Sequence, residues 1–227
     1  LPANGCSYDD GTASNIVKTD LEQERTIDGK VDPRLKNTLF YYDPNNLSEL
    51  FYGKTWLQWE NDPNSSVKRA KVYWKKYTNY DTRTTEDHEN NGINIRVVRL
   101  ADIYLMYAEA LNELGRTSES YQYIDKVRRR VNLPDLENST VFTGIGNDPA
   151  KMREQIIHER SCELAGESWR WLDLERWGFF DSADKIAWLT NRDSEFANFV
   201  IGKSNRFPIP YREVNLVKGL KQNPGYE

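Results

Sequence analysis

The chain has 227 residues, of which 38% are hydrophobic and 29% charged, and its formal net charge is −4. Nucleic-acid-binding proteins usually present a basic surface, and this acidic balance excludes that class, so no nucleic acid is expected as a partner. Seven Trp and thirteen Tyr exclude a disordered chain, because disordered chains are poor in aromatic residues. No apolar run approaches the roughly 20 residues that cross a bilayer, so contact with a membrane is expected only through a lipid anchor outside this sequence.

Residues 1–95 are predicted to be rich in loops, because turn-forming Pro, Gly, Asn and Asp recur throughout them. Two short runs rich in aromatic and β-branched residues, 39–42 and 71–77, are expected to be extended. A loop-rich segment of this length usually carries function or belongs to a larger fold. We therefore treat residues 1–95 as a candidate ligand-binding region.

The pattern changes near Arg96, where a long helix is predicted. Apolar residues recur at helical spacing along one face: Leu100, Ile103, Tyr104, Tyr107, Leu111 and Leu114. Smaller side chains form a second apolar stripe on the same helix: Ala101, Leu105 and Ala108. A helix with two apolar stripes is expected to lie between neighbouring elements rather than on a surface.

A second helix is predicted directly after the first. Gly115 is expected to end the first helix, and Thr117 to cap the second, which ends before Pro134. Two helices joined by a short Gly-containing turn are typical of a tetratricopeptide unit. One such unit cannot bury both of its faces alone, so neighbouring helices are expected to cover it.

Further helices are predicted in the second half of the chain. Asp148 and Pro149 indicate the start of a third helix, which would run to about Gly166. Shorter helices are expected over residues 168–177 and 181–189. The predicted fold class is therefore mainly α, a tetratricopeptide-like helical repeat with long irregular loops and a few short strands.

Charged residues recur at helical spacing in this half of the chain: Glu159, Arg160, Glu163, Arg170, Asp173 and Arg176. Glycoside hydrolases use two carboxylates about 5–10 Å apart across the bond they cleave. Glu159 and Glu163, however, lie at i and i+4 of one helix, where they stand side by side rather than flank a substrate. Neighbouring arginines would hold them ionised, whereas a general acid needs a raised pKa. We therefore predict a structural ion-pair network and no catalytic residue.

No metal and no cofactor is predicted. His158 has no second His at the spacing of a zinc-binding helix. Cys6 and Cys162 lie far apart and form no CxxC pair, so a zinc or redox motif is unsupported. Whether these two cysteines are paired with each other is left open.

Aromatic residues are densest between residues 40 and 80, in a stretch that is also rich in Asn and Asp. A sugar ring packs its C–H face on a flat aromatic side chain, while its hydroxyl groups bond polar neighbours. The candidate ligand-binding residues are accordingly Trp56, Trp59, Tyr52, Tyr41, Trp74, Asn61 and Asp62. The alternative, which the sequence leaves open, is that these rings form a small core beneath long loops. Four other tryptophans are assigned to the core: Trp169, Trp171, Trp177 and Trp188.

Three segments together resemble the SusD/RagB family. The first is the helical pair, residues 99–115 with 124–128. The second is the charged run, residues 159–178, with its Glu-Arg, Glu-Leu-Ala, Arg-Trp, Asp-Leu and Arg-Trp-Gly steps. The third is residues 208–226, which begin Pro-Ile-Pro and end Gln-Asn-Pro-Gly-Tyr. Gly166 stands where the family usually has an aromatic residue, and Ser168 where Gly is common.

The resemblance implies the C-terminal half of a SusD-like protein, with a loop-rich region 1–95, a helical region 96–227 and the N-terminal half absent. It implies a protein that is not an enzyme. Such a protein binds oligosaccharides or polysaccharides at the cell surface and delivers them to a SusC-like TonB-dependent porin of the outer membrane. A lipid anchor outside this sequence would hold it there. The alternative is a protein–protein interaction module, or a subunit of the same uptake complex that binds peptides or glycoproteins. A glycoside hydrolase is the third hypothesis.

Overall fold

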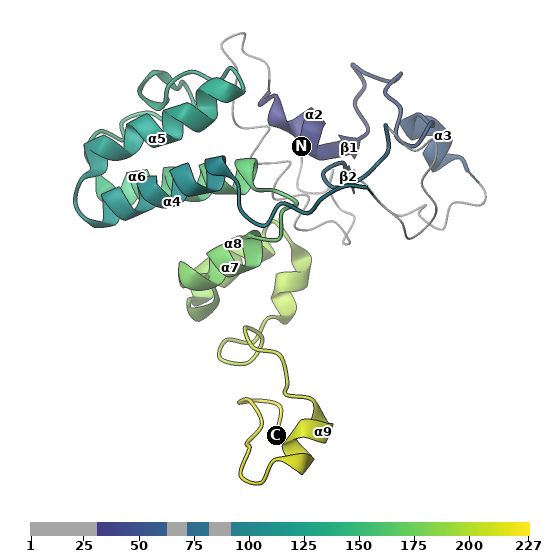
Figure 1. The fold of residues 1–227 in the computed structure, drawn as a ribbon, viewed down its shortest axis with the longest axis vertical. Helices are drawn as coiled ribbons and strands as arrows, with labels where there is room; N and C mark the ends of the chain where they lie inside the picture. The colour runs from purple at the N-terminus through teal and green to yellow at the C-terminus, as the bar shows by residue number, and fades with distance from the viewer. Residues whose placement is uncertain (1–30, 63–71, 82–91) are drawn as a thin grey trace. The chain divides into compact units, whose positions relative to one another are not determined.

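The computed structural model describes residues 31–62, 72–81 and 92–227 (Figure 1). These residues fall into two compact units, a larger one that ends at Ser168 and a smaller one from Trp169 to Glu227. The regular secondary structure of both units is mainly helical, and the described strands are three residues long. The predicted mainly α fold class is confirmed. The boundary predicted after residue 95 falls within the larger unit and stays a prediction.

The predicted helical pair is present as α4 (Leu100–Glu113) and α5 (Thr117–Arg130) (Figure 1). Gly115 lies between them in the left-handed region, with φ +73°, which is inexpensive only for glycine. The turn closes because the backbone N–H of Arg116 donates to the carbonyl oxygen of Leu111 at 2.9 Å. This short turn brings the two helices back against each other, and a third helix packs on both.

The structure buries the second of the two predicted stripes of α4. Ala101, Leu105 and Ala108 face the core, with exposed fractions of 9%, 0% and 0%. Of the first stripe, Leu111 is buried at 2%, whereas Ile103 and Leu114 are 45% and 72% exposed. Among the described residues, the expectation that both stripes lie against neighbouring elements is therefore met for the second stripe and for Leu111.

Thr117 does not cap α5 as predicted, because it is the first helical residue and Arg116 occupies the cap position. Its side chain has a different role. The hydroxyl group of Thr117 donates to Oδ1 of Asn112 at 2.9 Å, and Nδ2 of Asn112 donates to the carbonyl oxygen of Pro149 at 2.9 Å. The buried amide of Asn112 therefore joins the hairpin to the start of the next helix.

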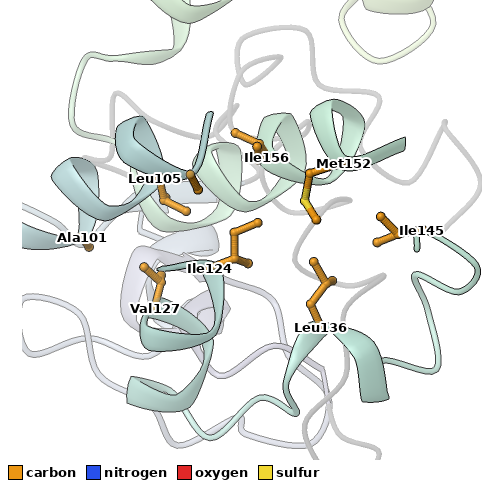
Figure 2. Packing of buried hydrophobic residues seen from close by; sticks show 9 residues of the cluster. Ala101, Leu105, Ile124, Val127, Leu136, Ile145, Met152 and Ile156 are labelled. Atoms are coloured by element: carbon orange, nitrogen blue, oxygen red, sulfur yellow. The ribbon is translucent and has the colours of Figure 1, made fainter. Parts of the chain in front are cut away.

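That helix is α6 (Pro149–Glu163). Asp148 caps it as predicted, accepting from the backbone N–H groups of Ala150 at 2.9 Å and Lys151 at 3.3 Å. Figure 2 shows the core that is enclosed by α4, α5, α6 and the segment between α5 and α6. Its buried residues are Ala101, Leu105, Ala108, Ile124, Val127, Leu136, Ile145, Met152 and Ile156.

A two-stranded antiparallel sheet forms the other part of the larger unit. A short helix, α2 (Arg34–Thr38), leads into β1 (Leu39–Tyr41), which pairs with β2 (Val72–Trp74). In this register Phe40 lies opposite Tyr73, and Leu39 lies opposite Trp74. Successive side chains of a strand point to opposite faces. The sheet therefore separates its aromatic residues into two groups.

The smaller unit contains α7 (Arg170–Arg176), α8 (Ala183–Thr190) and α9 (Tyr211–Leu216). Gly178, with φ +64°, ends α7. The prediction that its tryptophans are core residues is wrong, because Trp171 is 38% exposed and the other three are half-buried. The buried residues of α7, α8 and the turn between them are instead Asp173, Leu174, Phe179, Phe180 and Leu189.

The last part of the smaller unit is held by polar contacts rather than by a core. No residue between 194 and 227, all of them described, is buried. The side-chain amide of Gln222 bonds both backbone groups of Ile209. It accepts from the backbone N–H at 2.7 Å and donates to the carbonyl oxygen at 2.8 Å. Asn223 donates in addition to the carbonyl oxygen of Phe207 at 2.6 Å. The Gln-Asn pair of the C-terminal segment thus fixes the turn-rich end of the chain.

Candidate ligand-binding site

The candidate site is built on a tight turn. The backbones of Phe51 and Lys54 bond each other in both directions, at 2.9 and 3.2 Å. Tyr52 and Gly53 between them both have positive φ, +50° and +76°, as a two-residue hairpin turn requires. This conformation is costly for a tyrosine. Tyr52 is held in it by its edge-on contact with Phe51, 4.8 Å between ring centroids, and by the bond from its hydroxyl group to Asn79 at 2.9 Å.

The short helix α3 (Trp56–Glu60) follows this turn. It begins with a capping box, in which Thr55 accepts from the backbone N–H of Gln58 at 3.3 Å and Gln58 accepts from that of Thr55 at 2.8 Å. Reciprocal caps of this kind satisfy two backbone donors at a helix start. They allow a five-residue helix to hold Trp56 and Trp59 three positions apart on one face.

The rings gather into one aromatic cluster, whose members are Phe40, Phe51, Tyr52, Trp56, Trp59, Tyr73 and Tyr80. Phe40 and Phe51 are its buried centre, 1% and 5% exposed, and their rings stack at 5.0 Å. Trp56 packs against Phe40 at 5.5 Å and against Tyr73 at 5.9 Å. Its indole ring is half-buried at the rim of the cluster.

Trp59 is fixed more firmly than Trp56. Its indole N–H donates to the carbonyl oxygen of Phe51 at 2.8 Å. The ammonium group of Lys54 lies 4.7 Å from the centroid of its ring, in a cation–π contact, and is also paired with Asp62. Asn61 donates to the carbonyl oxygen of Leu57 at 2.7 Å at the end of the helix. The polar groups beside Trp59 are therefore already partnered within the turn and helix.

Two of the predicted site residues lie on the opposite face of the sheet. Tyr41 and Trp74 pack against the second core cluster, formed by Leu35, Leu39, Cys162 and Ala165. The cause is the two-residue periodicity of the strands, because Phe40 and Tyr73 face the aromatic cluster and their neighbours face away. The structure thus brings together Tyr52, Trp56, Trp59, Asn61 and Asp62, and places the other two elsewhere.

Trp74 also accounts for the glycine at position 166. Gly166 has φ +74°, and a Cβ atom built on it would lie 2.9 Å from Cε3 of the Trp74 ring. The indole ring therefore occupies the space that a side chain at position 166 would need. Ser168 lies in the left-handed region as well, with φ +66°, a conformation that glycine adopts at lower cost.

Lysines beneath and beside the aromatic cluster were missed by the sequence reasoning. Lys75 is 4% exposed, and its ammonium group bonds Glu49 and the carbonyl oxygen of Lys36. Lys54 covers Trp59, as described above. A lysine in a turn-rich segment carries no pattern that distinguishes a buried position from an exposed one, so the sequence offers no signal for either contact.

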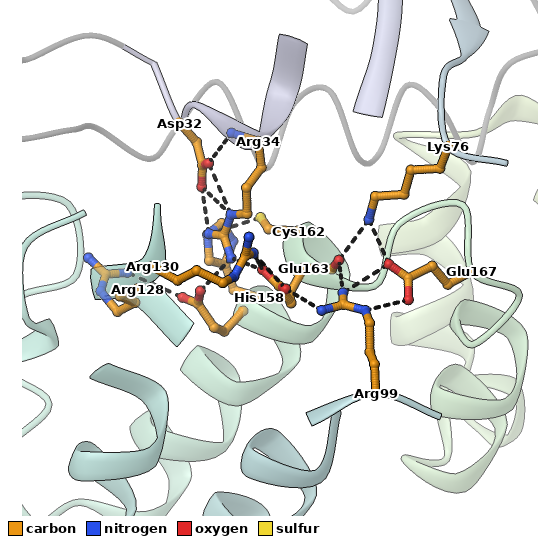
Figure 3. Close-up of polar contacts among 11 residues, drawn as sticks. Asp32, Arg34, Lys76, Arg99, Arg128, Arg130, His158, Cys162, Glu163 and Glu167 are labelled. Atoms are coloured by element: carbon orange, nitrogen blue, oxygen red, sulfur yellow. Dashed lines mark hydrogen bonds and ion pairs between the residues drawn. The ribbon is translucent and has the colours of Figure 1, made fainter. Parts of the chain in front are cut away.

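The larger unit also contains a buried charged network (Figure 3). Glu159 is paired with Arg34 at 2.6 Å and with Arg128 at 3.2 Å, and all three side chains are at most 5% exposed. Glu163 is paired with Arg99 at 2.5 Å and with Arg130 at 2.8 Å. Arg34 reaches it as well, at 3.2 Å.

The charged network continues to the segments on either side of α6. Arg34 pairs with Asp32 at 2.6 Å, and Glu167 pairs with Arg99 at 2.7 Å and with Lys76 at 2.8 Å. Buried charges of this kind are tolerated because each one has an opposite partner and hydrogen bonds. The network joins α2, the residues just after β2, the cap residue of α4 and the end of α5 to α6 and the segment that follows it.

Electrostatics hold the central carboxylates in their ionised form. Burial opposes ionisation of Glu163, but the charges of Arg34, Arg99 and Arg130 outweigh it and lower its pKa to about 2. Burial likewise opposes ionisation of Glu159, yet the charges of Arg34 and Arg128 lower its pKa. Neither residue has the raised pKa of a general acid.

The remaining residues of the predicted ion-pair network are divided between the two units. Arg160 of α6 pairs with Asp102 of α4 at 2.8 Å, both buried. In the smaller unit, Arg176 pairs with Asp173 at 2.9 Å, and Arg170 is the first residue of the same helix, α7. The carboxylates of α6 thus pair with arginines from distant segments, which the spacing along one helix does not indicate.

His158 and Cys162 lie on successive turns of α6, with Nε2 and Sγ 3.5 Å apart. Phe142 packs on the histidine ring at 4.5 Å between centroids. Cys6 lies outside the described residues, so its predicted relation to Cys162 stays open. Within residues 31–62, 72–81 and 92–227 there is no group of three or more side chains placed to hold a metal ion. No helix of these residues is both long and apolar enough to traverse a bilayer.

Comparison with known proteins decides the family. The family model for SusD matches residues 4–226. The chain belongs to the SusD family. A SusD superfamily protein from Bacteroides vulgatus, known from its crystal structure, is 26% identical with a TM-score of 0.73, and the match covers 93% of this chain and 43% of that one.

Two curated SusD-family relatives are also similar. The SusD-like protein P25 of Formosa agariphila is 43% identical over 108 residues, which are 47% of this chain and 19% of that protein. The starch-binding protein SusD of Bacteroides thetaiotaomicron is 26% identical over 156 residues, which are 69% of this chain and 26% of that protein. The chain therefore spans well under half the length of these relatives.

Proposed function

We propose that this SusD-family chain binds glycans at the cell surface, without acting on them as an enzyme, and delivers them to a SusC-like TonB-dependent transporter in the outer membrane. Support comes from membership of the SusD family over residues 4–226 and from a relative whose name describes starch binding. A lipid anchor outside the described residues would hold the protein at the outer membrane.

The aromatic cluster is the proposed glycan-binding site, and Trp56 is the residue that we propose to contact the sugar directly. Aromatic rings provide a large contact area at a low cost in conformational entropy, which suits the C–H face of a sugar. Trp56 lies at the rim of the cluster and is half-buried. Its indole ring is supported from below by Phe40 and Tyr73. Asn61 and Asp62 lie beside this ring, but their side chains already bond Leu57 and Lys54, so a sugar hydroxyl would have to share these groups.

Tyr52 and Trp59 are assigned a supporting role. The bond from the Trp59 indole to the backbone of Phe51 and the strained turn at Tyr52 keep α3 in place. Positions in strained backbone often mark binding sites, since their cost must be compensated by the surrounding structure. Tyr41 and Trp74 would act on this site only indirectly, through the sheet that carries Phe40 and Tyr73.

Affinity electrophoresis through gels that contain different polysaccharides, starch among them, tests this proposal. The chain is expected to be retarded by at least one polymer. Trp56→Ala should weaken that retardation by about tenfold, the effect of one lost ring contact of roughly 1.5 kcal/mol. The matched control is Trp188→Ala, another half-buried tryptophan in the smaller unit, which should migrate like the wild type. Equal retardation of the Trp56→Ala protein would refute the site.

The absence of catalysis is tested separately. The depressed pKa of Glu163 and of Glu159 argues against either residue as a general acid, because neither would be protonated near neutral pH. Incubation with the retarding polymer should therefore release no reducing sugar. Turnover that persists through repurification and is lost in Glu159→Gln would contradict the proposal.

A protein-interaction role is the second candidate, and one observation favours it. The outer face of α4 exposes large apolar side chains along its whole length, and contiguous apolar surface of this kind is typical of interfaces.

A further inference from the structure

Lys75 carries a buried positive charge at the base of the aromatic cluster. Its backbone N–H donates to the carbonyl oxygen of Thr38 at 2.9 Å, which continues the pairing of β1 and β2 by one residue. Lys75 stands two positions after Tyr73, so both side chains leave the sheet on the same face. The residue is 4% exposed, and its ammonium group lies 5.9 Å from the ring centroids of both Phe40 and Tyr80.

A buried ammonium group is tolerated only where it is paired and hydrogen-bonded. Lys75 donates to the carboxylate of Glu49 and to the carbonyl oxygen of Lys36, and the rings of the aromatic cluster attract its charge in addition. The side chain of Lys75 is 2% exposed and that of Glu49 is 24% exposed. The lysine is therefore the enclosed member of the pair, and the glutamate approaches it from the surface.

This ion pair lies close to the elements that carry the proposed contact residue. Glu49 stands two positions before Phe51, the first residue of the tight turn that precedes α3. The indole N–H of Trp59 in α3 donates to the carbonyl oxygen of Phe51 at 2.8 Å, and Trp56 is on the same short helix. A displacement of Glu49 would therefore be transmitted through Phe51 to the helix that holds Trp56.

We propose that Lys75 is a positioning residue of the glycan-binding site, which fixes α3 through Glu49 and Phe51 without contacting the sugar. This inference rests on the proposed glycan-binding function, but the placement of the rings can be measured without a glycan. A site whose contact residues are held in place beforehand loses less conformational entropy on binding. Loss of the Lys75 contacts should therefore weaken binding even though Trp56 remains.

Two variants test the positioning role. Lys75→Met keeps an unbranched apolar side chain and removes the ammonium group, whereas Glu49→Ala removes the carboxylate. Fluorine NMR of the chain labelled with 5-fluorotryptophan reports the surroundings of each indole ring, and the resonances of Trp56 and Trp59 are assigned by their loss on replacement with phenylalanine. Both variants should shift these two resonances. In affinity electrophoresis both should bind the retarding polymer about three- to tenfold more weakly, the effect of having to order one more side chain on binding.

The matched control is Asp102→Ala. Asp102 pairs with Arg160 at 2.8 Å, and the two side chains are 1% and 2% exposed. The control removes the carboxylate of a buried ion pair in the same unit, as Glu49→Ala does, so its loss of stability should be at least as large. Neither residue belongs to the aromatic cluster, and the control should leave the two tryptophan resonances and the retardation unchanged. An equal effect of the control would indicate general loosening of the unit and would overturn the proposal.

Urea unfolding establishes that each variant is folded under the conditions of the assay. Lys75→Met is the milder change, because Glu49 can turn to water, and it decides the question alone if the buried charge left by Glu49→Ala prevents folding. Resonances of Trp56 and Trp59 that stay in place would overturn the positioning role, as would shifted resonances with undiminished retardation. A wild-type chain that no polymer retards would refute the proposed function instead, and the resonances would still show whether Lys75 places the rings.

Discussion

Replacing Glu163 by glutamine tests whether the charged network stabilises the larger unit. The side chain of Glu163 is 1% exposed and pairs with Arg34, Arg99 and Arg130. Glutamine keeps the shape of the side chain and removes its charge. The three guanidinium groups would then face a neutral amide, and the free energy of unfolding should fall.

The magnitude follows from the pKa of Glu163. A value of about 2 in the folded state against 4.5 for an ordinary glutamate corresponds, at about 1.4 kcal/mol per pH unit, to roughly 3 kcal/mol of stability at neutral pH. Breaking one side of a buried ion pair typically costs about 3–5 kcal/mol, in agreement. The side chain of Arg130 is 56% exposed, and solvent weakens its attraction to Glu163. We therefore expect a loss of stability near the lower end of this range.

The depressed pKa of Glu163 also predicts how the stability difference between the two proteins changes with pH. Because the pKa of Glu163 is depressed in the folded state, its stabilising effect is complete above the unfolded-state value of about 4.5 and disappears as the pH falls toward 2. The stability difference between the wild type and Glu163→Gln should therefore be constant from about pH 6 to about pH 7 and should shrink steadily below about pH 4.5.

Urea unfolding followed by tryptophan fluorescence at several pH values measures this difference. The matched control is Glu113→Gln, another glutamate paired with an arginine, Arg153, but at the surface with side chains 49% and 43% exposed. Surface pairs contribute about 0–1 kcal/mol, so this control should barely change the midpoint. If Glu163→Gln were as stable as the wild type at neutral pH, or if its deficit persisted undiminished in acid, the reasoning would be refuted.

Four further substitutions test local features of the larger unit, each by urea unfolding. Ser168→Gly should raise stability by about 0.5–1 kcal/mol, since φ is +66° at this position and glycine adopts that region without strain; a loss would contradict the assignment. Gly166→Ala should cost about 2 kcal/mol or more, because its Cβ atom would lie 2.9 Å from the Trp74 ring. Gly115→Ala, with a similar φ of +73° but open space around it, should cost only about 1 kcal/mol, and equal losses would exclude the contact with Trp74. Asn112→Ala should cost about 2 kcal/mol by removing the bonds to Thr117 and Pro149, and an unchanged midpoint would show that these bonds do not stabilise the hairpin.

Local structure was largely predictable because its signals are local. The helical pair, the turn at Gly115 and the cap at Asp148 depend on residues within a few positions of one another. The short strands at Leu39–Tyr41 and Val72–Trp74 lie within the runs predicted to be extended. Thr117 shows the limit, because a residue suited to capping lies one position inside the helix and bonds a side chain instead.

The orientation of α4 could not be predicted in the same way. Both stripes of the helix are apolar in sequence, and the hydrophobic pattern favours the larger one. The structure buries Ala101, Leu105 and Ala108, because this stripe is the one that packs into the core with α5 and α6. Which stripe is buried therefore depends on what the neighbouring helices require, and a pattern within one helix carries no information about that.

The sequence predicted which segment supplies the aromatic residues of the candidate site, but not how their side chains lie relative to one another. The density of aromatic residues correctly indicated a segment in which rings gather, and Phe40 and Phe51 form the small core that one reading of the sequence described. The other reading, a ligand-binding surface, stays a prediction. The pleat of a two-stranded sheet then separated Tyr41 and Trp74 from Trp56 and Trp59. That separation requires the pairing register, which is a property of two segments together.

By itself, the sequence determined the mainly α class, the positions of the principal helices and the membership of the SusD family, since each depends on short-range patterns or on motifs in a fixed order. Only the tertiary structure decided which charges meet. Arg34 reaches Glu159 across 125 positions of the chain, and Arg99 reaches Glu163 across 64. Contacts between such distant residues arise because α2 and α4 each pack against α6, and no local spacing along the chain records them.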